Sequence, residues 1–199
     1  MPRAKALAST DGGGATEAGP YRVILADPPW EYKQRVAKIR KHYSLMPQEA
    51  ISALPVGALA APDCALFLWA TMPTLPDAFA VMQAWGFTYK SVAFTWVKLN
   101  ADGSPFLGLG SVTRSNAELC LFGYRGRPKV NHNHMSSVLM TRRRQHSRKP
   151  DEVYDRIMAL FDGPFIELFA RQQWPGWETA YSNQSGKFLA QPFLMKEAI

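Results

Sequence analysis

The chain has 199 residues and a formal net charge of +7, because 23 lysines and arginines outnumber 16 aspartates and glutamates. This length suits one domain with a sizeable core, and 15 prolines with 14 glycines indicate many short connections rather than a helical bundle. No apolar run approaches membrane-spanning length, and Cys64 and Cys120 each lie inside an apolar run, which is untypical of a disulfide. We therefore expect a cytoplasmic globular protein with both cysteines reduced.

The first residues predict a tail and then a buried strand. Residues 1–19 are low in complexity, and we expect a disordered tail, a domain over residues 20–186 and an extension over residues 187–199. Residues 21–26 (YRVILA) predict a strand that is covered on both faces. Pro28 and Pro29 cannot continue a ladder, so the strand must end there and present Asp27 and Trp30 at its carboxyl end. In open α/β sheets, ligands bind at that end.

The corner Asp27-Pro28-Pro29-Trp30 suits methylation of an exocyclic amine on a base. Such an amine is a poor nucleophile because its lone pair is delocalised into the ring. If the Asp27 carboxylate and the Pro28 carbonyl accept its two N–H bonds, the lone pair becomes localised. Pro29 helps to fix that carbonyl, and Trp30 can stack on a base that has left the duplex. The alternative is a strand-ending turn with an aspartate N-cap.

The next segments alternate between helix and strand. We expect a short helix from Pro47 to about Leu54, a buried strand over residues 65–70, and an amphipathic helix over residues 71–85. In that helix Leu75, Phe79 and Met82 should face inward, with Trp85 as a further candidate. Strands are predicted over residues 89–97 and 118–124. The glycine-rich loop between them, residues 100–116, lacks a dinucleotide fingerprint and suits a mobile loop over a site.

The last third of the domain begins with an irregular stretch. Residues 125–148 are predicted to be irregular and basic. A helix should follow from Pro150 and end at Gly163, before strands over residues 165–169 and 177–181. This order predicts an α/β fold with a mainly parallel sheet and helices on both faces. His132 and His134 lack an accompanying cysteine or carboxylate set, so no metal site is expected.

Basic residues gather in residues 33–41 (KQRVAKIRK) and 142–149 (RRRQHSRK). Both segments are predicted loops beside the motifs described above. Clustered cations there would contact phosphates, so Arg142, Arg143 and Arg144 are candidate nucleic-acid ligands. The alternative is a solvated surface that only aids solubility.

Seven motifs follow one another along about residues 20–186. They are Asp27-Pro28-Pro29-Trp30, His42-Tyr43, Phe67-Leu68-Trp69, residues 114–118 (RSNAE), residues 147–152 (SRKPDE), residues 166–171 (IELFAR) and Asn183-Gln184. In this order they resemble the DPPW-type adenine-N6 methyltransferases. That family includes the catalytic subunit of the eukaryotic messenger-RNA adenosine methylase and short bacterial and phage DNA adenine methylases.

The resemblance implies a Rossmann-like class I methyltransferase fold with S-adenosylmethionine as cofactor. The motif order looks permuted, as in the β-class enzymes, because the catalytic strand comes first and the cofactor strand near the end. Implied cofactor-binding residues are Asp27, Lys149, Glu167, Phe169, Arg171, Asn183 and Gln184. Implied substrate-binding residues are Trp30, Tyr43, Arg114, Asn116, Glu118, Arg142, Arg143 and Arg144. Taken singly, Lys149 could instead be a surface lysine and Glu118 a solvent-facing carboxylate.

These features favour an adenine-N6 methyltransferase acting on double-stranded DNA. The chain resembles the short bacterial and phage members and shows no zinc finger. RNA is the alternative substrate, and a non-catalytic nucleic-acid-binding partner is the alternative class. Cytosine-N4 methylation fits less well because such enzymes more often begin the motif with serine. A small-molecule amine methyltransferase would not need two basic segments. The limited surface for a duplex would suit a homodimer, which the sequence leaves open.

Overall fold

The computed structural model describes residues 19–31, 45–110, 112–132, 134–144 and 148–181. Its centre is a seven-stranded sheet with the order β5-β3-β4-β2-β1-β6-β7. The strands are β1 Tyr21–Ala26, β2 Ala60–Ala70, β3 Thr88–Leu99, β4 Ala117–Arg125, β5 Val138–Arg142, β6 Phe165–Leu168 and β7 Trp177–Ala180. Every neighbouring pair is parallel except the two that contain β4. The predicted mainly parallel sheet is therefore confirmed.

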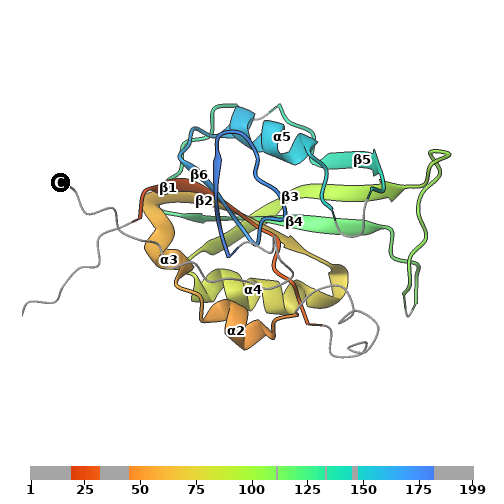
Figure 1. Ribbon diagram of the computed structural model, residues 1–199, viewed down its shortest axis with the longest axis horizontal. Helices are drawn as coiled ribbons and strands as arrows, with labels where there is room; N and C mark the ends of the chain where they lie inside the picture. Colours follow the sequence, from red (N-terminus) through yellow and green to blue (C-terminus); the bar gives the residue numbers. More distant parts are fainter. Residues whose placement is uncertain (1–18, 32–44, 111, 133, 145–147, 182–199) are drawn as a thin grey trace, which may run out of the picture.

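Helices cover both faces of the sheet, as predicted (Figure 1). The helices α2 Gln48–Ser52, α3 Val56–Leu59 and α4 Leu75–Ala84 lie on one face, and α5 Glu152–Leu160 lies on the other. A short 3-10 helix, Met72–Thr74, leads into α4. None of the described helices is long and apolar enough to cross a membrane.

Residues 23–26 of β1 are buried on both sides, which explains their unbroken apolar sequence. Ile24 packs into the core under α4, whereas Val23 and Leu25 belong to the core under α5. Its neighbours are β2 on one side and β6 on the other, both parallel to it. The chain leaves β1 towards β2 and returns much later to β6, so the carboxyl end of β1 is a topological switch point.

Two sequence predictions fail because tertiary contacts decide them. The irregular stretch predicted over residues 125–148 contains β5, which pairs in parallel with the end of β3. This pairing is between distant segments and has no local signal. Phe79 does not face the core: it is 40% exposed and packs edge-on against Tyr89. The α4 face that enters the core instead carries Ala78, Val81 and Met82.

Several element boundaries also differ from the predictions. Strand β2 begins at Ala60, five residues before the predicted run, and α3 precedes it directly. Helix α4 begins at Leu75 because the preceding turn is a 3-10 helix closed by a capping box between Thr71 and Thr74. Helix α5 begins at Glu152, so Lys149 lies in the segment leading to the helix. Cys64 and Cys120 are buried and free, as expected.

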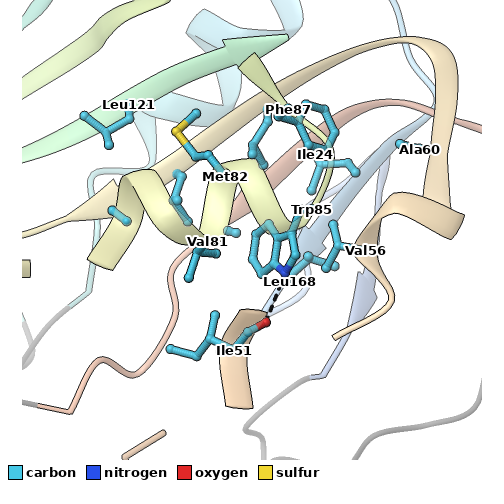
Figure 2. Packing of buried hydrophobic residues seen from close by; sticks show 14 of the residues in the cluster. Ile24, Ile51, Val56, Ala60, Val81, Met82, Trp85, Phe87, Leu121 and Leu168 are labelled. Atoms are coloured by element: carbon cyan, nitrogen blue, oxygen red, sulfur yellow. Dashed lines mark hydrogen bonds between the residues drawn. The ribbon is translucent and has the colours of Figure 1, made fainter. Parts of the chain in front are cut away.

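Trp85 links α4 to α2 in the larger core (Figure 2). Its side chain is 2% exposed, and its indole nitrogen donates a hydrogen bond of 3.0 Å to the carbonyl of Ile51. Replacement by alanine would leave a large cavity and remove this bond, so Trp85 is a strong stability determinant.

Trp85→Ala should lower the free energy of unfolding by about 3–5 kcal/mol, because a large buried aromatic side chain is lost. Phe79→Ala, in the same helix, should cost only about 0.5–1.5 kcal/mol, because its ring is partly exposed and mainly contacts Tyr89. Urea unfolding of both variants measures the difference. Equal losses would contradict the assignment of the two faces of α4.

Candidate active site

Backbone hydrogen bonds hold the corner that follows β1. The carbonyl of Pro29 accepts a hydrogen bond of 2.8 Å from the amide of Met46, and the carbonyl of Pro28 accepts one of 2.9 Å from the amide of Trp30. The indole nitrogen of Trp30 donates to the carbonyl of Trp69 at 2.9 Å. A carbonyl oxygen has two lone pairs, so that of Pro28 can still accept a second donor. The corner is therefore a rigid piece of backbone with a fixed acceptor.

Lys149 lies between two carboxylates. Its Nζ is 2.6 Å from Asp27 Oδ1 and 3.2 Å from Glu118 Oε2. The three side chains come from the end of β1, from β4 and from the segment before α5, and each is less than one fifth exposed. Lys149 is thus a mostly buried cation that is paired with Asp27, and the reading as a surface lysine is wrong.

Burial and charge act in opposite directions on these groups. Burial alone would lower the pKa of Lys149, but the carboxylates of Asp27 and Glu118 outweigh it and raise that pKa above its ordinary value. Burial acts to raise the pKa of Glu118, yet the cations Lys149 and Lys98 hold it below its usual range. Both groups therefore remain charged at neutral pH.

A cleft with about 380 Å³ of empty space, partly open to solvent, lies at this corner. Its walls come from the ends of β1, β2 and β6, from the start of β4 and from the segment before α5. The lining residues are Asp27, Pro28, Pro29, Trp30, Trp69, Ala70, Thr71, Glu118, Lys149 and Arg171. The predicted residues Asp27, Trp30, Glu118, Lys149 and Arg171 are thus brought together. Trp30 is only 6% exposed, so its ring forms a wall of the cleft.

The end of β6 places a buried acid beside this cleft. The Glu167 side chain is buried, and the hydroxyl of Tyr154 lies 3.0 Å from both of its carboxyl oxygens. Burial raises the pKa of Glu167 to about 8, with the hydrogen bond to Tyr154 opposing this shift and nearby Asp27 adding to it. Phe169 follows at φ +65°, a left-handed conformation that is costly for an aromatic residue. Such strain is concentrated at functional sites.

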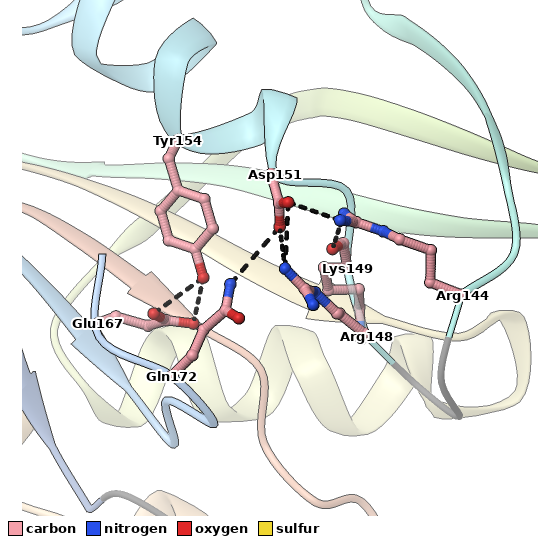
Figure 3. A network of polar contacts seen from close by, with 7 residues as sticks. All are labelled: Arg144, Arg148, Lys149, Asp151, Tyr154, Glu167 and Gln172. Atoms are coloured by element: carbon pink, nitrogen blue, oxygen red, sulfur yellow. Dashed lines mark hydrogen bonds and ion pairs between the residues drawn. The ribbon is translucent and has the colours of Figure 1, made fainter. Parts of the chain in front are cut away.

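An ion-pair cluster supports the segment that carries Lys149 (Figure 3). Asp151 accepts hydrogen bonds from the guanidinium groups of Arg144 and Arg148, and Gln172 approaches it at 3.5 Å. Arg144 also donates to the backbone carbonyl of Lys149 at 3.3 Å. Hydrogen bonding from Arg144, reinforced by Arg148, lowers the pKa of Asp151. Arg144 therefore has a structural partner, which the sequence did not indicate.

The other two predicted arginines lie at the end of β5. Arg142 is the last residue of β5, so the prediction that it lies in a loop is wrong. The amide of Arg143 donates to the carbonyl of Leu99, and its guanidinium lies 3.7 Å from the centre of the Phe106 ring. Both arginines are exposed. They flank the loop of residues 100–116, which starts at the end of β3.

The remaining predicted residues fall into two groups. Arg114 is exposed in the loop that leads into β4, and Asn116 is half-buried, with its carbonyl accepting a hydrogen bond from the amide of Lys98. Tyr43, Asn183 and Gln184 lie outside the described residues. Within the described part of the chain, no group of three or more histidine, cysteine, aspartate or glutamate side chains could hold a metal ion.

Sequence reasoning assigned no role to two residues that touch the charged groups: Lys98, which it did not single out, and Trp69, which it named only within a motif. Lys98, near the end of β3, forms an ion pair with Glu118. The Trp69 ring lies beneath Lys149, with Nζ 5.3 Å from the ring centre. The available signal for Lys98 was a lysine at the end of the run of residues 92–97 in β3, which is apolar except for Thr95. Its partner could be known only from the strand register.

Comparison with known proteins places the chain that carries this cleft in a family. The family model described as MT-A70 matches residues 21–182. The chain is 31% identical to the type II methyltransferase M.MunI of a Mycoplasma species, over 79% of this chain and 75% of the relative. It is 30% identical to the N(6)-adenosine-methyltransferase catalytic subunit METTL3 of Homo sapiens, over 87% of this chain. It is 28% identical to the N6-methyladenosine RNA methyltransferase MTA1 of Cryphonectria parasitica, over 82% of this chain.

The two named eukaryotic relatives are much longer than the matched region. The chain aligns with 30% of the length of METTL3 and with 51% of the length of MTA1. The matched region contains β1, the Asp27-Pro28-Pro29-Trp30 corner, Lys149 and β6. The expected family is confirmed, and the chain belongs to the MT-A70 family of adenine-N6 methyltransferases.

Proposed function

We propose that this chain transfers a methyl group from S-adenosylmethionine to the N6 amine of adenine in double-stranded DNA. The observation that carries this proposal is the carboxylate of Asp27, bound by the mostly buried Lys149 at 2.6 Å beside the fixed carbonyl of Pro28. This pair of acceptors lies in a cleft at the switch point of the sheet.

The corner is suited to activating a weak nitrogen nucleophile. Asp27 and the Pro28 carbonyl accept the two N–H bonds of the amine, which localises its lone pair towards the methyl donor. Lys149 holds one oxygen of Asp27, so the carboxylate keeps one orientation while the amine binds. Trp30 forms a wall against which a flipped base can stack. The surplus proton of the methylated amine is lost after transfer, so a strong base is not required.

The charges around the cleft fit S-adenosylmethionine. The cofactor supplies a methyl group that is electrophilic because it is bonded to a sulfonium. Lys149 and Arg171 are cations suited to its carboxylate, and the carboxyl group of Glu167, at the end of β6, is suited to accepting a hydrogen bond from its ammonium group. Phe169, strained at the end of β6, is suited to packing against the adenosine portion. Asn183 and Gln184 are proposed to bind the ribose hydroxyls.

The choice of DNA rests on resemblance to short family members. The methyltransferase M.MunI is matched over three quarters of its length, whereas METTL3 is matched over less than one third. The match to MTA1, which is named as an RNA methyltransferase, supports RNA as the alternative substrate. A non-catalytic partner is less well supported, because the acidic corner and Lys149 are intact. We also propose a cytoplasmic location and, given the small surface available for a duplex, a homodimer.

The function is tested by methyl transfer from labelled S-adenosylmethionine to unmethylated duplex DNA, single-stranded DNA and RNA in parallel. The products are digested to nucleosides and identified by mass. N6-methyldeoxyadenosine from duplex DNA is the expected product. Label in RNA alone would show that the substrate is RNA and not DNA, while the proposed methyl transfer would still hold. Nucleic-acid binding without any label would favour the non-catalytic partner.

Asp27→Ala should lower kcat by at least about a thousandfold, because a main acceptor for the amine is lost. Cofactor binding, measured by calorimetry, should stay largely intact. Asp27→Asn keeps the shape of the side chain and serves as the matched variant. Turnover near the wild-type level in Asp27→Ala would remove Asp27 from the activation of the amine, whereas Asp27→Asn, which keeps an acceptor oxygen, measures what the negative charge adds.

Arg142→Ala should weaken duplex binding and reduce the slope of log K against log salt concentration by about 1, the value for one phosphate contact. Arg142 is preferred to Arg144 for this test because Arg144 also supports the Lys149 segment. Arg127→Ala, in the turn after β4 at the opposite end of the sheet, is the charge-matched control. An unchanged slope in Arg142→Ala would exclude that phosphate contact.

Glu167→Gln should raise the thermal unfolding temperature by a few degrees at about pH 8–9. The pKa of Glu167 rises from its ordinary 4.5 to about 8 in the fold, so its ionisation opposes folding increasingly as pH rises between these values. Below pH 4.5 the carboxyl is neutral in both states, and the variant should match the wild type. Calorimetry across this range measures the effect, and parallel curves for the two proteins would contradict the raised pKa.

A further inference from the structure

Four charged side chains form a continuous row beside the cleft. The row runs from Asp27 through Lys149 and Glu118 to Lys98. Lys149 Nζ lies 2.6 Å from Asp27 Oδ1 and 3.2 Å from Glu118 Oε2, while Lys98 Nζ pairs with Glu118 Oε1. Charges alternate along the row and sum to zero. Lys98 is the one member that does not line the cleft.

The sheet register fixes Lys98 against Glu118. The amide of Lys98 donates to the carbonyl of Asn116 at 2.9 Å, and Glu118 lies opposite Trp96. Lys98 and Glu118 are therefore diagonal neighbours on antiparallel strands, and this places their side chains on one face. Lys98 Nζ also lies 4.8 Å from the centre of the Trp96 ring. The ammonium is thus held by its strand, by a carboxylate and by an indole.

We propose that Lys98 is a positioning residue for methyl transfer, which holds Glu118 so that Lys149 remains bound to Asp27. The inference rests on the proposed function of the cleft. Lys98 acts through Glu118 and Lys149 and does not itself contact the reacting groups.

The sharing of Lys149 explains why Lys98 matters. Glu118 presents only one oxygen to Lys149, because Lys98 occupies the other. Lys149 is consequently closer to Asp27 than to Glu118. Without Lys98, both oxygens of the mostly buried Glu118 carboxylate would compete for Lys149, and the shorter contact of Lys149 with Asp27 would be lost. Asp27 would then have no fixed orientation towards the amine.

The electrostatics of the row point the same way. Burial acts to raise the pKa of Glu118, and Lys149 and Lys98 keep it below its ordinary value. The charged groups that face Glu118 are Lys98 from β3, Lys149 from the segment before α5 and, beyond Lys149, Asp27 from β1; Arg171 lines the same cleft. Loss of Lys98 should therefore raise the pKa of Glu118.

The first experiment does not depend on any substrate. The carboxyl group of Glu118 is titrated by carbon NMR in the wild type and in Lys98→Met, which removes the charge and keeps most of the stem. The pKa of Glu118 should rise in Lys98→Met. It should stay unchanged in Lys90→Met, an exposed lysine of the same strand. Lys98→Gln undergoes the same titration if Lys98→Met does not fold. An unchanged Glu118 titration in the variant that folds would overturn the proposal.

The second experiment measures catalysis. Lys98→Met should lower kcat about tenfold and move the acidic limb of the kcat–pH profile to higher pH. Lys98→Arg, which keeps the charge, should restore most of kcat. In a Glu118→Gln background, Lys98→Met should have little further effect, since the influence of Lys98 passes through Glu118.

The outcomes separate this inference from the proposed function. Two results would show that Lys98 has only a structural role. One is an equal fall of kcat when Lys98→Met is made in the wild type and in Glu118→Gln. The other is a fall of stability in Lys98→Met with an unchanged kcat–pH profile. If the wild type methylates no nucleic acid, the proposed function fails, and the Glu118 titration still decides whether Lys98 controls the row.

Discussion

The pairing of Lys149 with Asp27 is the interaction on which the rest of the site depends. Asp27 directly follows the buried end of β1, where an unpaired carboxylate would be costly. Lys149 supplies the opposite charge from a segment more than a hundred residues away in sequence, and Glu118 balances the second side of the ammonium. Removal of one partner from such a mostly buried pair leaves an uncompensated charge, so the loss of any of these side chains should destabilise the arrangement of the others.

Several parts of the fold serve to place that one ammonium group. The Asp151 cluster anchors the chain just after Lys149, and Arg144 also binds the carbonyl of Lys149 itself. The ring of Trp69 supports Lys149 from below, and β4 delivers Glu118. Because β4 is the strand that runs against the others, its first residues reach the same edge of the sheet as the last residues of β1 and β2. The single antiparallel strand is thus a feature of the site as well as of the fold.

The sheet also separates rigid parts of the site from exposed ones. The corner after β1 is fixed by backbone hydrogen bonds and by Trp30, which suits groups that must orient an amine. Arg142 and Arg143 lie on the exposed end of β5 beside the loop of residues 100–116. In this arrangement the groups proposed to activate the amine lie at the ends of buried strands. The side chains proposed to contact the nucleic acid are exposed and can adapt to its shape.

Local signals in the amino-acid sequence were enough to identify several elements. Apolar runs and prolines marked β1 and its end, and the order of motifs indicated the family and the residues Asp27, Glu118 and Lys149. Four features depend on contacts between distant segments and become visible only in the folded chain: the strand β5, the exposure of Phe79, the partner of Arg144 and the role available to Lys98. Local sequence records the preference of a segment for strand or helix. It does not record register or the identity of a neighbour, because these arise only when the segments pack together.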